Sequence, residues 1–366
     1  MKRFLAVFLI GLLPLSALAK AQSGINQPME KSGDWIQIVE DSPFQLGETQ
    51  EKSAGGAGFL ETAYGTYPSL DGSTVSVPMA REFARQHLGL PEGELDSFVS
   101  FSTTHDAYVN LIQGKPNIGP QLPFSGAVME QGRPVDIFIG TEPSQEERKL
   151  AEEAGVRLMV TPVCYDAFVF IVNVQNPIEN LTVNQIQAIY MDQLRYWEDV
   201  EDYEEVPEYS YDEEAEEWMA AGGGDDDKTE IFAYTRQRNS GSQTAMEHLV
   251  MQEKPLSMRH MNYFQVFEMS SLVSQIGNFQ NDGNALGYTY KYYVDTLYRD
   301  EGIKTVAIDG VQPTDENIRS GKYPFATCYY AVTREGESAD FVEWMKSPEG
   351  QRCIAQAGYI PYGEGV

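Results

Sequence analysis

The chain has 366 residues, which is enough for two domains or for one large two-lobed unit. Its 55 acidic residues outnumber its 26 basic residues and give a formal net charge of −29. That excess argues against binding to nucleic acids or to anionic membrane surfaces. It does not exclude a small anionic ligand. Exposed charges beyond about 10 Å are largely screened, whereas backbone amides and arginines that line a pocket act at contact range.

Residues 1–21 have the pattern of a secretory signal peptide. Lys2 and Arg3 precede an apolar run, and small residues offer cleavage after Ala19 or Ala21. No later segment has enough uninterrupted apolar residues to span a bilayer. The pattern therefore predicts an exported protein.

Residues 22–63 are polar and dotted with glycine, and we predict an N-terminal extension that is partly disordered. From residue 64 onward, short apolar strands alternate with amphipathic helices. This alternation predicts an α/β fold with mostly parallel sheets. The expected strands include 135–140, 156–163 and 167–173, and the expected helices include 77–88, 144–155 and 182–191.

An acidic insert interrupts this alternation at residues 198–228. It contains fifteen acidic residues and a glycine triplet. Like charges at this density repel one another and stay solvated, so the insert is predicted to be a surface loop or hairpin. It lacks the spacing of an EF-hand, and a calcium site is not expected there.

The chain has three cysteines, Cys164, Cys328 and Cys353. In an exported protein they allow one disulfide and one remaining thiol, and three buried free cysteines are the alternative. Their spacing matches no metal site, and the chain has only four histidines. No metal centre is expected.

The stretch RQRNSGSQTAMEHLV, residues 236–250, follows the apolar run IFAYT and leads into a helical pattern. The first turn of a helix has unpaired N–H groups and the positive end of the dipole. Gly241 lets a ligand approach the backbone, and an arginine upstream offers a planar fork that suits a tetrahedral oxyanion. An ordinary helix cap with solvated arginines explains this motif alone equally well.

Three further loops also place small polar residues before a helix. They contain Ser73 and Thr74, then Ser102 to Thr104, and then Thr141 and Glu142. Each loop alone is weak evidence, because Ser and Thr cap helices everywhere. Four such loops at the carboxyl ends of strands are stronger evidence, because ligands of open α/β sheets bind at that edge.

In their order along the chain, these loops resemble the phosphate-binding proteins of bacterial ABC importers, in the branch with a DGST first loop. The motifs are YPSLDGST, FSTTHDAY, DIFIGTEPS, RNSGSQTAME and NALGYTYKYY, and the resemblance covers roughly residues 64–366 without the insert. It implies a bilobal periplasmic-binding-protein fold of type II, in which two α/β lobes joined by two hinge strands hold the ligand in a cleft. Lobe 1 would combine 64–166 with 324–366, and lobe 2 would be 167–323.

The resemblance also implies a ligand-binding set. Arg238 would grip phosphate oxygens, and Glu142 lies where the family has an aspartate that accepts the ligand's own proton. Gln243 stands in place of a family glycine, which leaves a related oxyanion open as the ligand. The implied residues are Ser73, Thr74, Thr103, Thr104, Glu142, Arg238, Ser242, Gln243 and Thr244.

The resemblance further implies a function and a disulfide. The protein would be a periplasmic monomer without cofactors that captures inorganic phosphate, or a similar tetrahedral oxyanion, for the membrane permease of an ABC importer. Cys164 and Cys328 would lie on neighbouring hinge strands and could pair, with Cys328 and Cys353 as the competing pair.

Two other functional classes remain open at this point. One is a surface, interaction or sensor protein that keeps the fold and has lost transport. The other, less expected, is a hydrolase. The chain has no G-x-S-x-G motif, and the adjacent residues His105 and Asp106 rarely form a catalytic relay. We therefore expect a protein that is not an enzyme.

Overall fold

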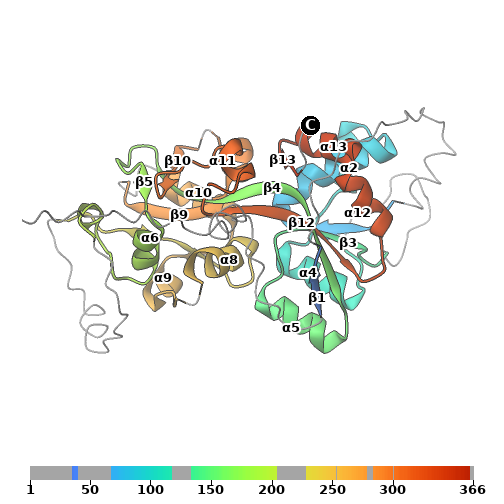
Figure 1. Cartoon of the computed structure of the whole chain (residues 1–366), viewed down its shortest axis with the longest axis horizontal. Helices are drawn as coiled ribbons and strands as arrows, with labels where there is room; N and C mark the ends of the chain where they lie inside the picture. The colour runs from blue at the N-terminus through green and yellow to red at the C-terminus, as the bar shows by residue number, and fades with distance from the viewer. Residues whose placement is uncertain are drawn as a thin grey trace, which may run out of the picture.

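The computed structural model describes residues 35–39, 67–117, 133–203, 228–252, 254–277, 283–299 and 301–362. Figure 1 shows two groups of helices and strands at the two ends of a long central strand, β4 (Leu158–Asn173). We call them the β3 side and the β9 side, after strands β3 (Ile137–Gly140) and β9 (Ala285–Tyr290). The predicted α/β class is confirmed. No helix within the described ranges combines the length and the hydrophobicity needed to cross a membrane.

Strand β4 is shared by both sides of the molecule. Its first half pairs antiparallel with β12 (Ala326–Arg334), and its second half pairs antiparallel with β9. The path through the described part of the nine-stranded sheet is β2 (Leu70–Gly72), β3, β12, β4, β9 and β6 (Phe232–Ala233). The expectation of mostly parallel sheets is wrong, because β12 runs antiparallel to β3 and β4, and β9 runs antiparallel to β4. Two separate strands, 156–163 and 167–173, were expected here. Asp166 is tolerated inside one continuous strand because its Oδ1 accepts hydrogen bonds from the backbone N–H groups of Ala167 (2.7 Å) and Tyr292 (3.3 Å).

The β3 side consists of the following elements around β3 and β12. They are β2 (Leu70–Gly72), η1 (Thr74–Ser76), α2 (Val77–Leu88), α3 (Glu92–Phe98), α4 (Thr104–Gln113), α5 (Gln145–Ala154), α12 (Ala339–Lys346), α13 (Pro348–Gln356) and β13 (Ile360–Pro361). Helix α5 shows why the sequence pattern predicted these helices well. Ser144 and Glu147 form a capping box at its start, and Gly155 adopts the left-handed conformation at its end.

The β9 side contains shorter elements. They are β5 (Asn180–Leu181), α6 (Val183–Tyr190), η2 (Trp197–Asp199), β6 (Phe232–Ala233), β7 (Thr235–Arg236), α8 (Gly241–Ala245), the π-helical turn η3 (Met246–Met251), α9 (Met258–Tyr263), β8 (Gln265–Val266), α10 (Met269–Gly277), η5 (Tyr293–Leu297), β10 (Ile303–Thr305), β11 (Ala307–Ile308) and α11 (Asp315–Arg319). Phe168, Phe170 and Tyr288 pack at the centre of its core.

The N-terminal extension and the acidic insert lie mostly outside the described residues. Within the extension, strand β1 (Ile36–Ile38) pairs parallel with the start of β4. Residues 204–227 of the insert are not described. The lobe boundaries expected at 166/167 and 323/324 stay a prediction.

The three cysteines are all free and buried, so the expected disulfide is wrong and the alternative of three buried thiols is confirmed. Cys164 lies opposite Tyr329 in the pairing of β4 with β12, and Cys328 lies opposite Tyr165. Successive residues of a strand point to opposite faces, so the two thiols enter different core clusters. Cys353 packs in the same cluster as Cys164, on the other face from Cys328.

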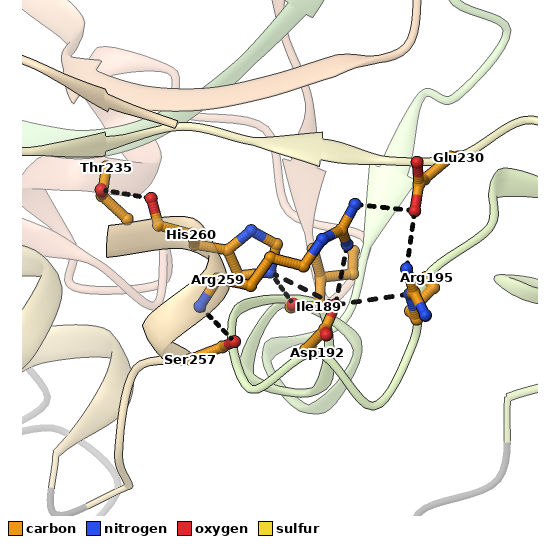
Figure 2. A network of polar contacts seen from close by, with 8 residues as sticks. All are labelled: Ile189, Asp192, Arg195, Glu230, Thr235, Ser257, Arg259 and His260. Atoms are coloured by element: carbon orange, nitrogen blue, oxygen red, sulfur yellow. Dashed lines mark hydrogen bonds and ion pairs between the residues drawn. The ribbon is translucent and has the colours of Figure 1, made fainter. Parts of the chain in front are cut away.

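A network of charged side chains holds helix α9 on the β9 side (Figure 2). Arg259 donates to Asp192 Oδ1 (3.0 Å) and to Glu230 Oε1 (2.7 Å), and Arg195 donates to the same oxygen of Glu230 (2.8 Å). Two arginines thus share two carboxylates in a partly buried cluster, where screening by water is weaker than at the surface. The network ties α9 to the end of α6 and to the strand that leads into β6.

The same network continues toward strand β7 (Figure 2). The buried His260 has its Nε2 atom 3.0 Å from the carbonyl oxygen of Ile189, and burial lowers the pKa of its imidazole. Thr235 Oγ1 donates to the carbonyl oxygen of His260 (3.3 Å). Because Thr235 directly precedes Arg236, these contacts help to fix the position of the Arg236 backbone.

Candidate functional site

A cavity of about 430 Å³ opens between the β3 side and the β9 side. We call it the polar cavity. Six of the nine residues that the resemblance implies as ligand-binding line it, from both sides. They are Ser73, Thr74, Thr103 and Thr104 from the β3 side, and Arg238 and Ser242 from the β9 side.

The first loop enters the polar cavity directly after strand β2. A Cβ atom on Gly72 would lie 2.0 Å from the carbonyl oxygen of Ile139, so only glycine allows this approach of the two strands. Ser73 N–H donates to the same carbonyl oxygen (3.0 Å). The hydroxyl groups of Thr74 and Tyr293 lie 3.0 Å apart and connect the two walls of the cavity.

The second loop ends at the start of helix α4. Thr103 has φ 77° and ψ 166°, a backbone conformation that glycine normally occupies. The buried carboxylate of Asp71 supports the loop by accepting hydrogen bonds from Ser102 N–H (2.7 Å) and Asn110 Nδ2 (3.1 Å). Burial raises the pKa of Asp71, although these hydrogen bonds lower it. Sequence reasoning did not assign Asp71 this supporting role.

The cation buried in the polar cavity is Arg236, which was not in the expected set. Its residue is only 8% exposed, and it donates from Nε to the carbonyl oxygen of Val266 (3.2 Å) and from Nη2 to that of Phe267 (2.8 Å). Burial lowers the pKa of its guanidinium, but an arginine stays protonated in proteins. The Arg238 side chain, by contrast, is 83% exposed and lies 3.7 Å from Glu146.

The helix that follows begins at Gly241, with Ser240 as its N-cap. Ser240 accepts a hydrogen bond from Gln243 N–H, and Ser242 is buried against the polar cavity. The Gln243 side chain does not line the cavity. Its Oε1 accepts from Arg236 N–H (3.1 Å) and from the Tyr288 hydroxyl, so Gln243 supports the arginine from behind.

Glu142 and Thr244 line a second cavity of about 520 Å³, which shares residues with the polar cavity, among them Arg238 and Gly241. Glu142 Oε1 accepts from the Tyr330 hydroxyl (2.9 Å), and Arg148 Nη2 lies 3.5 Å from Oε2. The structure therefore brings neither Glu142 nor Thr244 to the wall of the polar cavity.

His105 also lines the polar cavity, but its imidazole is already engaged. Nδ1 lies 3.0 Å from Oε1 of Glu147, the buried residue that caps α5. This hydrogen bond raises the pKa of His105. The histidine thus joins α4 to α5. Within the described ranges, no group of three or more His, Cys, Asp or Glu residues is arranged to hold a metal ion.

Comparison with protein families identifies the chain. The model of the PBP superfamily domain matches residues 123–349, which is more than half of the 366 residues. The chain belongs to the PBP superfamily domain family. Arg236, Arg238 and Ser242 lie inside the matched range of this PBP domain, and Ser73, Thr74, Thr103 and Thr104 precede it.

Two curated relatives share short segments with this chain. A phosphate-binding protein PstS 2 of Streptococcus agalactiae is 31% identical over 84 residues, which are 22% of this chain and 27% of the relative. A phosphate-binding protein PstS of Bacillus subtilis is 31% identical over 81 residues, 21% of this chain and 26% of the relative. The matched segment thus spans about a quarter of the length of these relatives.

Two solved structures resemble this chain over most of its length. A protein of Clostridium perfringens, described as a phosphate ABC transporter substrate-binding protein with bound phosphate, is 21% identical and covers 80% of this chain and 98% of its own, with a TM-score of 0.51. An ABC-type phosphate transport receptor of Vibrio cholerae is 17% identical, and its match covers 80% of this chain and 99% of the receptor. Its TM-score is also 0.51. At these identities the likeness shows the fold.

Proposed function

We propose that this protein is an exported, non-catalytic binding protein that captures inorganic phosphate, or a similar tetrahedral oxyanion, for the permease of an ABC importer. The observation that carries the proposal is the buried guanidinium of Arg236, which lines the same cavity as the hydroxyl groups of the opposite wall. The names of the curated relatives and of the similar structures support phosphate as the ligand.

The chemistry of the polar cavity suits an oxyanion. A buried guanidinium offers two parallel N–H donors to a tetrahedral anion, and the contact is strong because little water competes for it. Arg236 uses Nε and Nη2 to hold the carbonyl oxygens of Val266 and Phe267, which orients its remaining donors. The overall negative charge does not prevent this contact, because distant surface charges are screened.

The proposed ligand-binding residues omit four members of the expected set and add Arg236. Arg236 replaces Arg238 as the main cation, and Gln243 becomes its support. Glu142 and Thr244 lie at the second cavity. The proposed set is Ser73, Thr74, Thr103, Thr104, Arg236 and Ser242.

The proton that phosphate carries near neutral pH needs an acceptor in this site. A hydroxyl group both donates and accepts hydrogen bonds, so a serine or threonine can accept that proton while its neighbours donate. Discrimination between phosphate and sulfate would then rest on the hydroxyl groups of the polar cavity.

Calorimetric titration of the mature protein with phosphate, sulfate and molybdate tests the proposal. We expect a saturable heat with phosphate at one ligand per chain and no release of product. No heat with any of the three anions would overturn the binding role. Release of a product from an added phosphate ester would instead point to an enzyme.

Glu142→Gln is expected to leave the ratio of phosphate to sulfate affinity within about twofold of the wild-type ratio. Glu142 lines the second cavity, and Tyr330 and Arg148 already hold its carboxylate. Calorimetry with both anions, on a variant whose thermal unfolding shows a folded protein, measures the ratio. A collapse of the ratio would show that Glu142 reaches the ligand and accepts its proton.

A further inference from the structure

The walls of the polar cavity already touch one another. The hydroxyl groups of Thr74 and Tyr293 are 3.0 Å apart. A Cβ atom on Gly241 would lie 2.5 Å from Thr141 Oγ1, so these residues are in close contact across the two sides. Asn239 Nδ2 donates to Glu146 Oε2 at 2.7 Å. The cavity therefore has its volume of about 430 Å³ while its two walls are in contact.

This volume is larger than a tetrahedral oxyanion needs. At about 30 Å³ for each water molecule, 430 Å³ would hold roughly fourteen. Cavities of about 300 to 1,000 Å³ are typical for small organic ligands. An anion of one central atom and four oxygens, bound at Arg236, would leave most of the space empty or filled with water.

The wall next to Arg236 is apolar and aromatic. Phe267, whose carbonyl oxygen holds Arg236, is 65% exposed, and Leu297 is 45% exposed. Among the described residues these are two of the five large apolar side chains with such exposure, and both line the polar cavity. Met269 and Tyr298 also line the cavity here, together with the polar residues Glu268 and Ser270.

We propose that the polar cavity binds phosphate monoesters whose organic group is apolar or planar. The phosphate group would bind at Arg236 and the hydroxyl groups, and the organic group would cover Phe267 and Leu297. Covering exposed apolar side chains is favourable in proportion to the area removed from water. This inference rests on the proposed function, because it uses the same anion-binding residues.

Calorimetry with phenyl phosphate, glycerol 3-phosphate and inorganic phosphate tests the inference. We expect phenyl phosphate to bind about tenfold more tightly than inorganic phosphate and to compete with it for one site. Glycerol 3-phosphate should bind more weakly than phenyl phosphate, because its organic group is polar. Leu297→Ser should weaken phenyl phosphate about three- to tenfold and leave inorganic phosphate within about twofold. Phe267→Ser should weaken phenyl phosphate by a similar factor.

Tyr263→Ser is the matched control, because Tyr263 is 79% exposed and does not line the polar cavity. It should change neither affinity. If inorganic phosphate binds and phenyl phosphate does not, or if phenyl phosphate is insensitive to both substitutions, the inference is overturned and the proposed function stands. If none of the three ligands binds, the proposed function fails with it.

Discussion

Arg236→Ala is expected to weaken phosphate binding by at least about 30-fold. Removing one partner of a desolvated, hydrogen-bonded charge pair costs on the order of 2–5 kcal/mol, which corresponds to about 30-fold to several thousand-fold in affinity. Arg236 is the buried cation of the polar cavity, and its loss would leave the bound anion without its counter-charge. Calorimetric titration of the variant with phosphate measures the effect.

Arg238→Ala is the matched control, and we expect it to weaken binding less than about threefold. Its side chain is mostly exposed, and exposed charges contribute little to affinity. Arg236→Lys keeps the charge but loses the planar fork, so its affinity should fall between wild type and Arg236→Ala. If Arg238→Ala proves as damaging as Arg236→Ala, the assignment of the main cation to Arg236 is incorrect.

Asp166→Asn is expected to stabilise the protein more at pH 8 than at pH 4.5. Burial raises the pKa of Asp166 from its ordinary value of 3.8 to about 7. A raised pKa means that the folded state holds the proton more tightly than the unfolded state does. The contribution of Asp166 to the free energy of unfolding is therefore complete below about pH 4, and it is lost as the pH rises to about 7. The difference corresponds to roughly 4 kcal/mol at most.

Thermal unfolding of both proteins in phosphate-free buffer at several pH values measures this effect. The variant stays neutral throughout, so the gap between the two midpoints should widen between pH 4 and pH 7. Other titrating groups are common to both proteins and cancel in the difference. Asp340→Asn, which replaces an exposed aspartate, is the control for the substitution itself. A constant gap for Asp166→Asn would mean that Asp166 is ionised in the folded protein throughout this range.

The sequence predicted the helices well because their ends carry local signals. Helix α2 has the bounds that the apolar spacing predicted, and Gly89 ends it in the left-handed conformation. The strands were harder to predict. β4 was expected as the two strands 156–163 and 167–173. The buried carboxylate of Asp166, which lies between them, accepts hydrogen bonds from its neighbour Ala167 and from Tyr292, which is distant in sequence.

The residues expected from the sequence and the lining of the polar cavity agree in part. Small polar residues after strands predicted the hydroxyl groups of both loops, because that pattern is local. The choice between Arg236 and Arg238 depends on burial. The sequence held a signal, since Arg236 directly follows the apolar run IFAYT and is the last residue of β7, while Arg238 lies in the turn beyond it. The family resemblance pointed to Arg238 instead.

The placements of Gln243, Glu142 and the cysteines have a common physical reason. Each depends on which neighbour a side chain meets across the fold. Gln243 accepts a hydrogen bond from Tyr288, and Glu142 accepts one from Tyr330. Cys328 faces away from Cys164 because of the register between two strands. No local pattern in the sequence carries these pairings.

The unusual backbone conformation of Thr103 lowers the stability of the fold at a residue that lines the polar cavity. Residues held in a conformation that glycine normally occupies cost of order 1–3 kcal/mol. Glycine at position 103 would remove that strain, but it would also remove the hydroxyl group from the wall of the polar cavity. The chain thus keeps a conformationally unfavourable residue where a hydrogen-bonding group is useful. A ligand that bonds to this hydroxyl would stabilise a segment whose backbone conformation is unfavourable.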